Sequence, residues 1–267
     1  MRLAIGSFVC VCALVLLPGS GCALRNQASL PQKDYLVRDQ LIFNCDFHLP
    51  RQHRLLDELT ARRTEISERL LLPTSDEPIN VFLFEDESRF RKYMVKHHPQ
   101  FPKRRAFFVK NDTDLNVYAY WGERVGEDLR HEISHGYLHA VVPNLPFWLD
   151  EGLAEYFEVP RGKRGFNRLH IYHLVTELKN DRWEPNLQRL QKIDSASAMT
   201  QLDYAESWLW IHFLLESSPD HAKLIQDQLA RLRMTGEAEP LGSRIYESID
   251  NADTLVLDHL AYLAEQL

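Results

Sequence analysis

The spacing of hydrophobic and polar positions changes along the chain near Trp121. Before it, short apolar runs separated by polar turns are typical of strands, and two longer stretches repeat apolar residues at helical spacing. After it, apolar positions recur at helical spacing almost to the end. We therefore predict an α+β fold, with a small mixed sheet and its helices in residues 34–122 and a mostly helical part in residues 123–267, together one unit.

The individual elements follow from these runs and from the residues that interrupt them. Because proline disfavours helical backbone in the residue before it, helices are expected to end before Pro99 and Pro143. The predicted strand regions are 35–47, 79–85, 105–110 and 115–120. The predicted helices are 53–72, 87–97, 123–141, 147–158, 167–180, 203–217, 219–234, 240–250 and 252–266.

One predicted helix carries the sequence His131-Glu132-Ile133-Ser134-His135. Positions four apart in an α-helix share a face and lie about 6 Å apart along the axis. Both imidazoles can therefore hold one metal ion, with Glu132 placed to take a proton from a bound water. This is the H-E-x-x-H signature of zinc hydrolases. The alternative is a chance match, an amphipathic helix with two ordinary histidines among the 12 of the chain.

A third metal ligand is expected on the next helix, which Pro146 can open because proline is tolerated in a first turn. The short connection makes the two helices antiparallel neighbours, so Glu151 can face back toward the imidazoles. Two histidines, one carboxylate and a water form a catalytic zinc site with an open position. His139 is the alternative third ligand, disfavoured because each step of four residues drifts around the helix and climbs it.

Two more residues of the second helix have predicted roles. Glu155 is four residues after Glu151, and we expect it to accept a hydrogen bond from the ring N–H of His131. The alternative is a solvated carboxylate. Gly152 costs about 1 kcal/mol relative to alanine inside a helix. Close approach of the two helices at the metal would explain it.

The motif, together with Trp-Leu-Asp-Glu-Gly-Leu-Ala-Glu-Tyr-Phe-Glu at residues 148–158, resembles the gluzincin metallopeptidases and most closely the bacterial peptidase MA-like domains. This resemblance implies a zincin-like fold and an active zinc hydrolase. It implies that His131, His135 and Glu151 bind zinc. It also implies that Glu132 is the general base.

The same resemblance implies parts of the site beyond the motif. Gluzincins commonly stabilise the oxyanion with a Tyr or His from a later helix, and Tyr204 is the candidate here; a packing tyrosine is the alternative. An edge strand that pairs with the substrate backbone is expected at residues 116–120, with plain sheet core as the alternative. The chain has Asp150 where the aminopeptidase branch has asparagine, and it lacks their segment for a free N-terminus, which argues against that specificity.

Residues 1–21 have the pattern of an export signal, with a basic start, an uncharged apolar run and small residues before the cleavage point. The apolar run is short for a membrane span. Cys22 then resembles the modified cysteine of a bacterial lipoprotein, which predicts a lipid anchor in the cell envelope and a tether over residues 22–33. The alternative is cleavage after Ala23, which would leave Cys22 free to pair with Cys45 in an oxidising compartment.

Composition narrows the function further. The net charge is −7, and no basic field favours nucleic acid as a partner. The basic run at residues 103–105 is expected to be a solvated turn. No C-x-x-C pair is present, so zinc binding depends on histidine and carboxylate side chains.

These patterns together predict an exported hydrolase with Zn²⁺ as cofactor and a peptide or protein as substrate. Zinc would polarise the scissile carbonyl, and Glu132 would activate water and pass the proton to the leaving amine. Two alternatives stay open. One is a non-catalytic envelope protein that keeps the helix pair for stability or partner binding, and the other is a zinc hydrolase of a non-peptide amide or ester.

Overall fold

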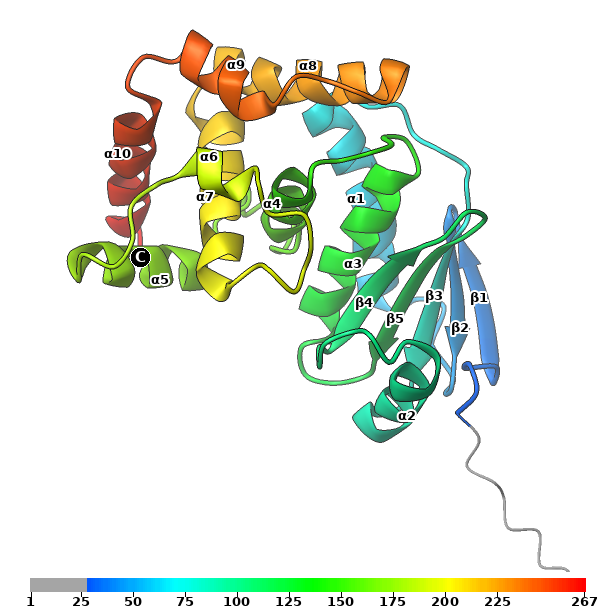
Figure 1. Cartoon of the computed structure of the whole chain (residues 1–267). Coiled ribbons are helices and arrows are strands. Elements are labelled where there is room, and N and C mark those ends of the chain that lie inside the picture. Colours follow the sequence, from blue (N-terminus) through cyan, green and yellow to red (C-terminus); the bar gives the residue numbers. More distant parts are fainter. Residues whose placement is uncertain (1–27) are drawn as a thin grey trace, which may run out of the picture.

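The computed structural model describes residues 28–267, so the predicted signal peptide, Cys22 and the first half of the predicted tether lie outside the described range. The fold is α+β, as predicted, with a mixed sheet at one end and a helical part at the other (Figure 1). The strands are β1 (Asp34–Arg38), β2 (Leu41–Cys45), β3 (Ile79–Phe84), β4 (Ala106–Lys110) and β5 (Leu115–Tyr120). No helix within this range is long and apolar enough to cross a membrane.

Each predicted helix is present, with both ends within two residues of the prediction. The helices are α1 (Arg54–Leu70), α2 (Glu87–His97), α3 (Val125–His139), α4 (Phe147–Phe157), α5 (Arg168–Lys179), α6 (Leu187–Leu190), α7 (Gln201–Ser217), α8 (Pro219–Thr235), α9 (Leu241–Ser248) and α10 (Ala252–Ala264). The short α6 was not predicted, because four residues are too few to show a helical period. The single strand region predicted at 35–47 is two antiparallel strands, which turn at Asp39 with φ 47°.

The strand order is β1-β2-β3-β5-β4, so β4 is an edge strand and β5 is paired on both sides. β3 runs parallel to β2 and β5, whereas β1 and β4 are antiparallel to their neighbours. The side chain of Asn111 accepts hydrogen bonds from the backbone N–H groups of Thr113 and Asp114, and this turn folds β4 back along β5. The prediction that residues 116–120 form an edge strand is therefore wrong, because β3 takes the other side of β5.

Helices cover both faces of the sheet. Val81 and Leu83 of β3 belong to the main core with α1 and α3, whereas Phe82 and Phe84 face a smaller aromatic core with α2. This alternation is the period of two expected of a strand. Cys45 of β2 is buried in the main core and is free among the described residues, and burial raises the pKa of its thiol to about 12.

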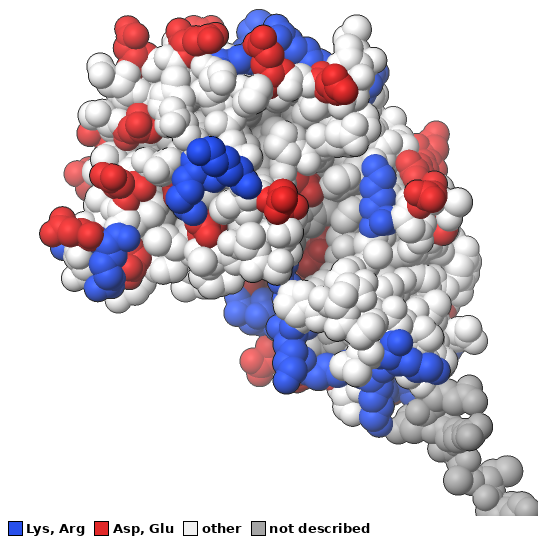
Figure 2. All heavy atoms as spheres, in the orientation of Figure 1, with Lys and Arg blue, Asp and Glu red and all other residues white. Residues whose placement is uncertain are grey.

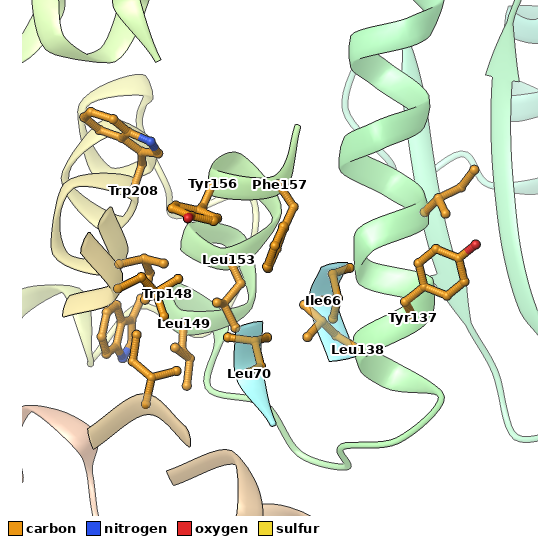
Figure 3. Packing of buried hydrophobic residues seen from close by; sticks show 14 of the residues in the cluster. Ile66, Leu70, Tyr137, Leu138, Trp148, Leu149, Leu153, Tyr156, Phe157 and Trp208 are labelled. Carbon is orange, nitrogen blue, oxygen red and sulfur yellow. The ribbon is translucent and has the colours of Figure 1, made fainter. Parts of the chain in front are cut away.

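Helix α4 is enclosed by other helices. Figure 3 shows its side chains between Trp208 of α7 on one side and Ile66 of α1 and Leu138 of α3 on the other. A Cβ atom added to Gly152 would lie 2.7 Å from the backbone oxygen of Ser207 in α7. The glycine thus allows α4 to approach α7, and the prediction that it serves the approach of α4 to α3 is wrong.

Candidate metal centre

Helix α3 lies on the sheet with Leu129 and Ile133 fully buried beneath it. This packing fixes the rotation of the helix about its axis. His131 and His135 are then directed toward α4, where their ring nitrogens meet a carboxylate. Phe108 of β4 stacks on the ring of His135 at a centroid distance of 5.9 Å and borders the site on the sheet side.

All three predicted metal ligands converge in the structure. The Nε2 atoms of His131 and His135 are 3.3 Å apart, and Glu151 Oε2 lies 3.4 Å from the first and 3.6 Å from the second. The three side chains are 12%, 7% and 6% exposed. Two imidazole nitrogens and one carboxylate oxygen at this spacing are a donor set that zinc accepts, with room for a further ligand.

The burial of the Glu151 carboxylate is a second observation that favours a metal ion at this position. Its Oε2 atom is buried and has no hydrogen-bond partner among the described residues. A buried acceptor without a donor costs about 1–3 kcal/mol, and more when it is charged. A cation among the three converging atoms would remove that cost, so the residues present fit a bound metal.

The charges around the site favour a cation. Burial opposes a charge on His135, but Asp150 and Glu151 outweigh it and raise the pKa of its imidazole to about 10. Burial also raises the pKa of Glu151, yet the two histidines hold it at about 2. Protons on the imidazoles or a metal ion between them would each balance the negative charge of these carboxylates. Protons and metal therefore compete for the same nitrogens.

A carboxylate holds the far ring nitrogen of each histidine. His135 Nδ1 lies 2.9 Å from Asp150 and His131 Nδ1 lies 3.3 Å from Glu158. Such bonds fix the ring orientation and leave Nε2 free for a metal. Burial tends to raise the pKa of Asp150, but His135 and His139 outweigh this effect and hold that pKa well below its usual range.

The predicted bond between Glu155 and His131 is wrong. Glu155 Oε2 lies 2.7 Å from His170 Nε2, and Glu158 takes the place beside His131. The reason is helical geometry: a residue four positions after Glu151 is turned by about 40°, whereas one seven positions later returns to within about 20°. Burial, and then the charge of Glu155, raise the pKa of Glu158 to about 7.

Two other groups of side chains could hold a metal, and both share a histidine with the first. They are His135 with His139 and Asp150, and His131 with Glu155 and Glu158. Both oxygens of Asp150 already face imidazole nitrogens, at 2.9 and 2.8 Å, although His139 Nδ1 is buried without a partner among the described residues. Glu151 is the one carboxylate of the three groups with an unpartnered buried oxygen.

Glu132 borders the site between the two histidines of its motif. It is 9% exposed and contributes to the walls of two cavities, the smaller of which also touches His135 and Glu151. Burial raises the pKa of this carboxyl, and the two neighbouring imidazoles lower it in part. A raised carboxyl pKa suits a general base, because its proton affinity approaches that of the group it must deprotonate.

Tyr204 lies in the first turn of α7, which a capping box between Thr200 and Asp203 fixes in place. Its hydroxyl accepts a hydrogen bond from Arg104, whose guanidinium lies over the tyrosine ring at 5.3 Å. Burial raises the pKa of Tyr204 to about 12, and the charge of Glu151 adds to the effect. The hydroxyl therefore stays protonated at neutral pH and can donate toward the site.

Arg104 is a site residue that the sequence did not reveal. The run at residues 103–105 was predicted to be a solvated turn, and this is wrong for two of its members: Arg104 faces Tyr204 and Arg105 binds Asp128 at 2.7 Å. In the sequence, only the position of Arg104 just before a predicted strand could have indicated a role in the site. A loop has no regular spacing from which the direction of a side chain can be predicted. Burial lowers the pKa of the Arg104 guanidinium, but Tyr204 and then the charges of Glu151 and Glu132 outweigh this effect, so the pKa is raised.

The site opens into a recess between the sheet and the helical part, where acidic side chains are visible (Figure 2). The larger cavity, about 460 Å³, has mostly charged and polar walls that include His131, Glu158 and Tyr204. A smaller cavity of about 190 Å³ lies beside it. Arg104, His131 and Glu132 border both cavities and so lie between them.

Comparisons with known proteins add nothing to this geometry. No protein-family model matches the chain, and no curated protein matches it. The likeness to gluzincins therefore rests on the H-E-x-x-H motif and on residues 148–158.

Proposed function

We propose that the chain is a zinc-dependent metallopeptidase of the gluzincin type, exported and held at the cell envelope through Cys22. The main support is the convergence of His131 Nε2, His135 Nε2 and Glu151 Oε2 within 3.6 Å of one another. The unpartnered, buried oxygen of Glu151 adds to it. Asp150 and Glu158 would orient the two imidazoles, as carboxylates beside histidine ligands commonly do.

The side chains around this centre have different roles in the proposed amide hydrolysis. When bound, zinc would polarise the scissile carbonyl and lower the pKa of a water to about 7. Glu132 takes a proton from the attacking water and later gives it to the leaving amine. Tyr204 and Arg104 border the larger cavity beside Glu132, and both can donate hydrogen bonds to the oxygen that becomes negative.

The free edge of β4 is the proposed path for the substrate backbone. β4 is outermost in the sheet, and Phe108 in its middle stacks on His135. An extended peptide can add to such an edge through main-chain hydrogen bonds, largely independent of its side chains. β4, residues 106–110, thus replaces the segment at 116–120 in this role.

The test compares zinc content and hydrolysis in three forms of the protein. The wild type is expected to bind one zinc per chain and to cut peptides in a mixed library, both followed by mass spectrometry. Glu132→Gln should keep the zinc and lose about 10²- to 10⁴-fold in rate, the usual contribution of a general base. The control is Glu123→Gln, an exposed glutamate just before α3, which should behave as the wild type.

Two results would count against the proposal. A wild type that binds no zinc at neutral pH would remove the metal centre. A Glu132→Gln variant as active as the wild type would remove the assigned base. Cleavage of esters or non-peptide amides without any peptide cleavage would keep the metal chemistry and change the substrate class.

A further inference from the structure

The chain enters the described part of the fold beside α2 (Figure 1). The backbone oxygen of Ala28 lies 3.1 Å from Nε2 of His97, in the last turn of that helix. Leu30 packs against the small aromatic core, which α2 covers. The first described residues therefore lie against the C-terminal end of α2, on the face of the sheet opposite α1 and α3.

The segment from α2 to the start of β4 is strongly basic. Residues 88–105 contain seven Lys and Arg and no Asp or Glu, whereas the whole chain has 31 basic against 38 acidic residues. The arginines have partners within the fold, which are Asp46 for Arg89, Glu87 for Arg91, Tyr204 for Arg104 and Asp128 for Arg105. Lys92, Lys96 and Lys103 are exposed, and none of them pairs with a carboxylate of the described residues. Figure 2 shows basic side chains gathered over α2, so this end of the molecule carries positive charge that the fold does not neutralise.

An exposed apolar side chain lies among these charges. The buried residues of α2 are Phe90, Tyr93 and Met94. Since positions three and four apart share a face of a helix, Lys92, Val95 and Lys96 lie together on the opposite side. Val95 is 72% exposed. A valine between lysines suits the surface of a membrane, where the apolar side chain can leave water while the ammonium groups stay among the headgroups.

The predicted lipid anchor is close to this side of α2 along the chain. Six residue steps lead from Cys22 to Ala28, and they span about 20 Å at most. An acylated Cys22 would therefore hold α2 near the bilayer, at an effective concentration on the order of millimolar. At such a concentration a weak attraction is enough to fix how the protein lies on the membrane.

Charge determines which side of the protein meets the membrane. Near an anionic leaflet each lysine contributes roughly fivefold to the binding equilibrium, within a Debye length of about 8 Å. The net charge of the chain is −7 despite the basic segment, so the remaining residues are acidic overall. An anionic bilayer therefore attracts the α2 side and repels the rest of the surface.

We propose that Lys92, Val95, Lys96 and Lys103 form a membrane-docking face, which places the protein on a bilayer that contains anionic phospholipid. The ammonium groups bind headgroup phosphates, and Val95 enters the boundary between headgroups and acyl chains. The inference rests on the lipid anchor of the proposed function and not on its peptidase chemistry. Because Lys103 also borders the larger cavity, docking brings one wall of that cavity close to the bilayer.

The experiment attaches the mature chain, residues 22–267, to vesicles through Cys22 and a maleimide lipid. Cys45 is buried, so Cys22 is the thiol that reacts. One type of vesicle is phosphatidylcholine with phosphatidylglycerol as every fourth lipid, and the other is phosphatidylcholine alone. An amine-reactive acetylating reagent is added, and mass spectrometry follows the reaction rate at each lysine. Lys179 and Lys192, which are exposed in the helical part, are the reference lysines.

The three lysines of the docking face should react at least about fivefold more slowly on the anionic vesicles than on the neutral ones, whereas the two reference lysines should not change. Salt at about 1 M should remove the difference, because the Debye length falls to about 3 Å. Equal rates on both vesicles, or the same slowing at the reference lysines, overturn the docking face and leave an acidic partner protein as the alternative occupant of this surface.

Matched double variants test the lysines of α2 themselves. Lys92→Gln with Lys96→Gln should remove most of the protection of Lys103 on the anionic vesicles. Lys179→Gln with Lys192→Gln removes the same charge elsewhere and should keep that protection. Thermal melts check that both variants fold. Protection of Lys103 that is equal in the two variants overturns the role of α2.

A further measurement separates the docking face from the proposed function. Mass spectrometry of the full chain, made with its own residues 1–21 in a bacterial host, reports whether Cys22 is acylated. An unmodified Cys22 overturns the anchor, whereas the vesicle experiment still decides the docking face because the maleimide lipid replaces the acyl chains. An acylated Cys22 without protection of the lysines keeps the anchor and overturns the docking face.

Discussion

His135 belongs to two groups of side chains that could hold a metal, and these groups make opposite predictions for two neighbouring carboxylates. In the proposed centre, His135 binds through Nε2 together with His131 and Glu151. In the alternative, it binds through Nδ1 together with His139 and Asp150. Glu151→Gln and Asp150→Asn are isosteric changes at positions that are 5% and 8% exposed, so they compare the two groups with little change in packing.

The expected losses differ by more than the error of a binding measurement. Zinc binding worth about 10–16 kcal/mol, divided over four coordination positions, gives about 2.5–4 kcal/mol for Glu151, or about 70- to 900-fold in Kd. Asp150 bonds to the far nitrogen of His135 at 2.9 Å, and an asparagine there keeps an acceptor but loses the charge. Losing such a partner costs about 10- to 100-fold in metal affinity.

The assay is the apparent zinc Kd at pH 7, measured by competition with a chelator of known affinity. His139→Gln is a third variant, expected to lower the affinity by less than about tenfold because it acts only through Asp150. Thermal melts of the metal-free proteins check that all three variants fold. The reasoning is refuted if Asp150→Asn and His139→Gln each lose more affinity than Glu151→Gln, since the metal would then lie in the alternative group.

Three more predictions concern catalysis, packing and acid stability. Tyr204→Phe should lower kcat by about 10²-fold with zinc content unchanged, as expected for a lost oxyanion donor, and an unchanged kcat would make it a packing residue. Gly152→Ala should lower the free energy of unfolding by about 1–3 kcal/mol in urea titrations, because the new methyl group would meet the Ser207 backbone oxygen at 2.7 Å; equal stability would refute that contact. Burial, and then the neighbouring His259, lower the pKa of His212 to about 3, below its ordinary value of 6.5, so the unfolded chain binds more protons between these values and stability falls as the pH drops through them. From pH 6.5 to pH 4 the wild type should lose roughly 3 kcal/mol more than His212→Gln, and parallel curves would contradict this.

The sequence predicts the features that depend on local periodicity. The apolar spacing gave every helix except the short α6, and helical geometry alone placed His131 and His135 on one face. The short turn around Pro146 placed Glu151 opposite them. Each of these inferences needs only the conformation of a continuous segment, or of two segments joined by a few residues, and no long-range contact has to be known.

The features that the sequence did not predict all depend on contacts between distant segments. β5 is not an edge strand because β3 pairs with it, and the order of strands in a sheet cannot be predicted from a local sequence pattern. Arg104 reaches Tyr204 from a loop a hundred residues earlier in the chain. Glu158 replaced Glu155 beside His131 because the relative rotation of α3 and α4 favours the carboxylate seven positions after Glu151 over the one four positions after it.

Helix α4 carries the carboxylate half of the candidate metal centre, because Glu151 meets the imidazoles directly and Asp150 and Glu158 orient them. The geometry of the centre therefore depends on how α4 is placed against α3. The side of α4 that packs on α7 makes that placement, and at Gly152 the α7 backbone at Ser207 leaves no room for a Cβ atom. Since α7 also carries Tyr204 in its first turn, the packing of α4 on α7 positions the candidate metal ligands and the predicted oxyanion donor together. The arrangement of the two motif helices therefore depends on contacts with a third helix.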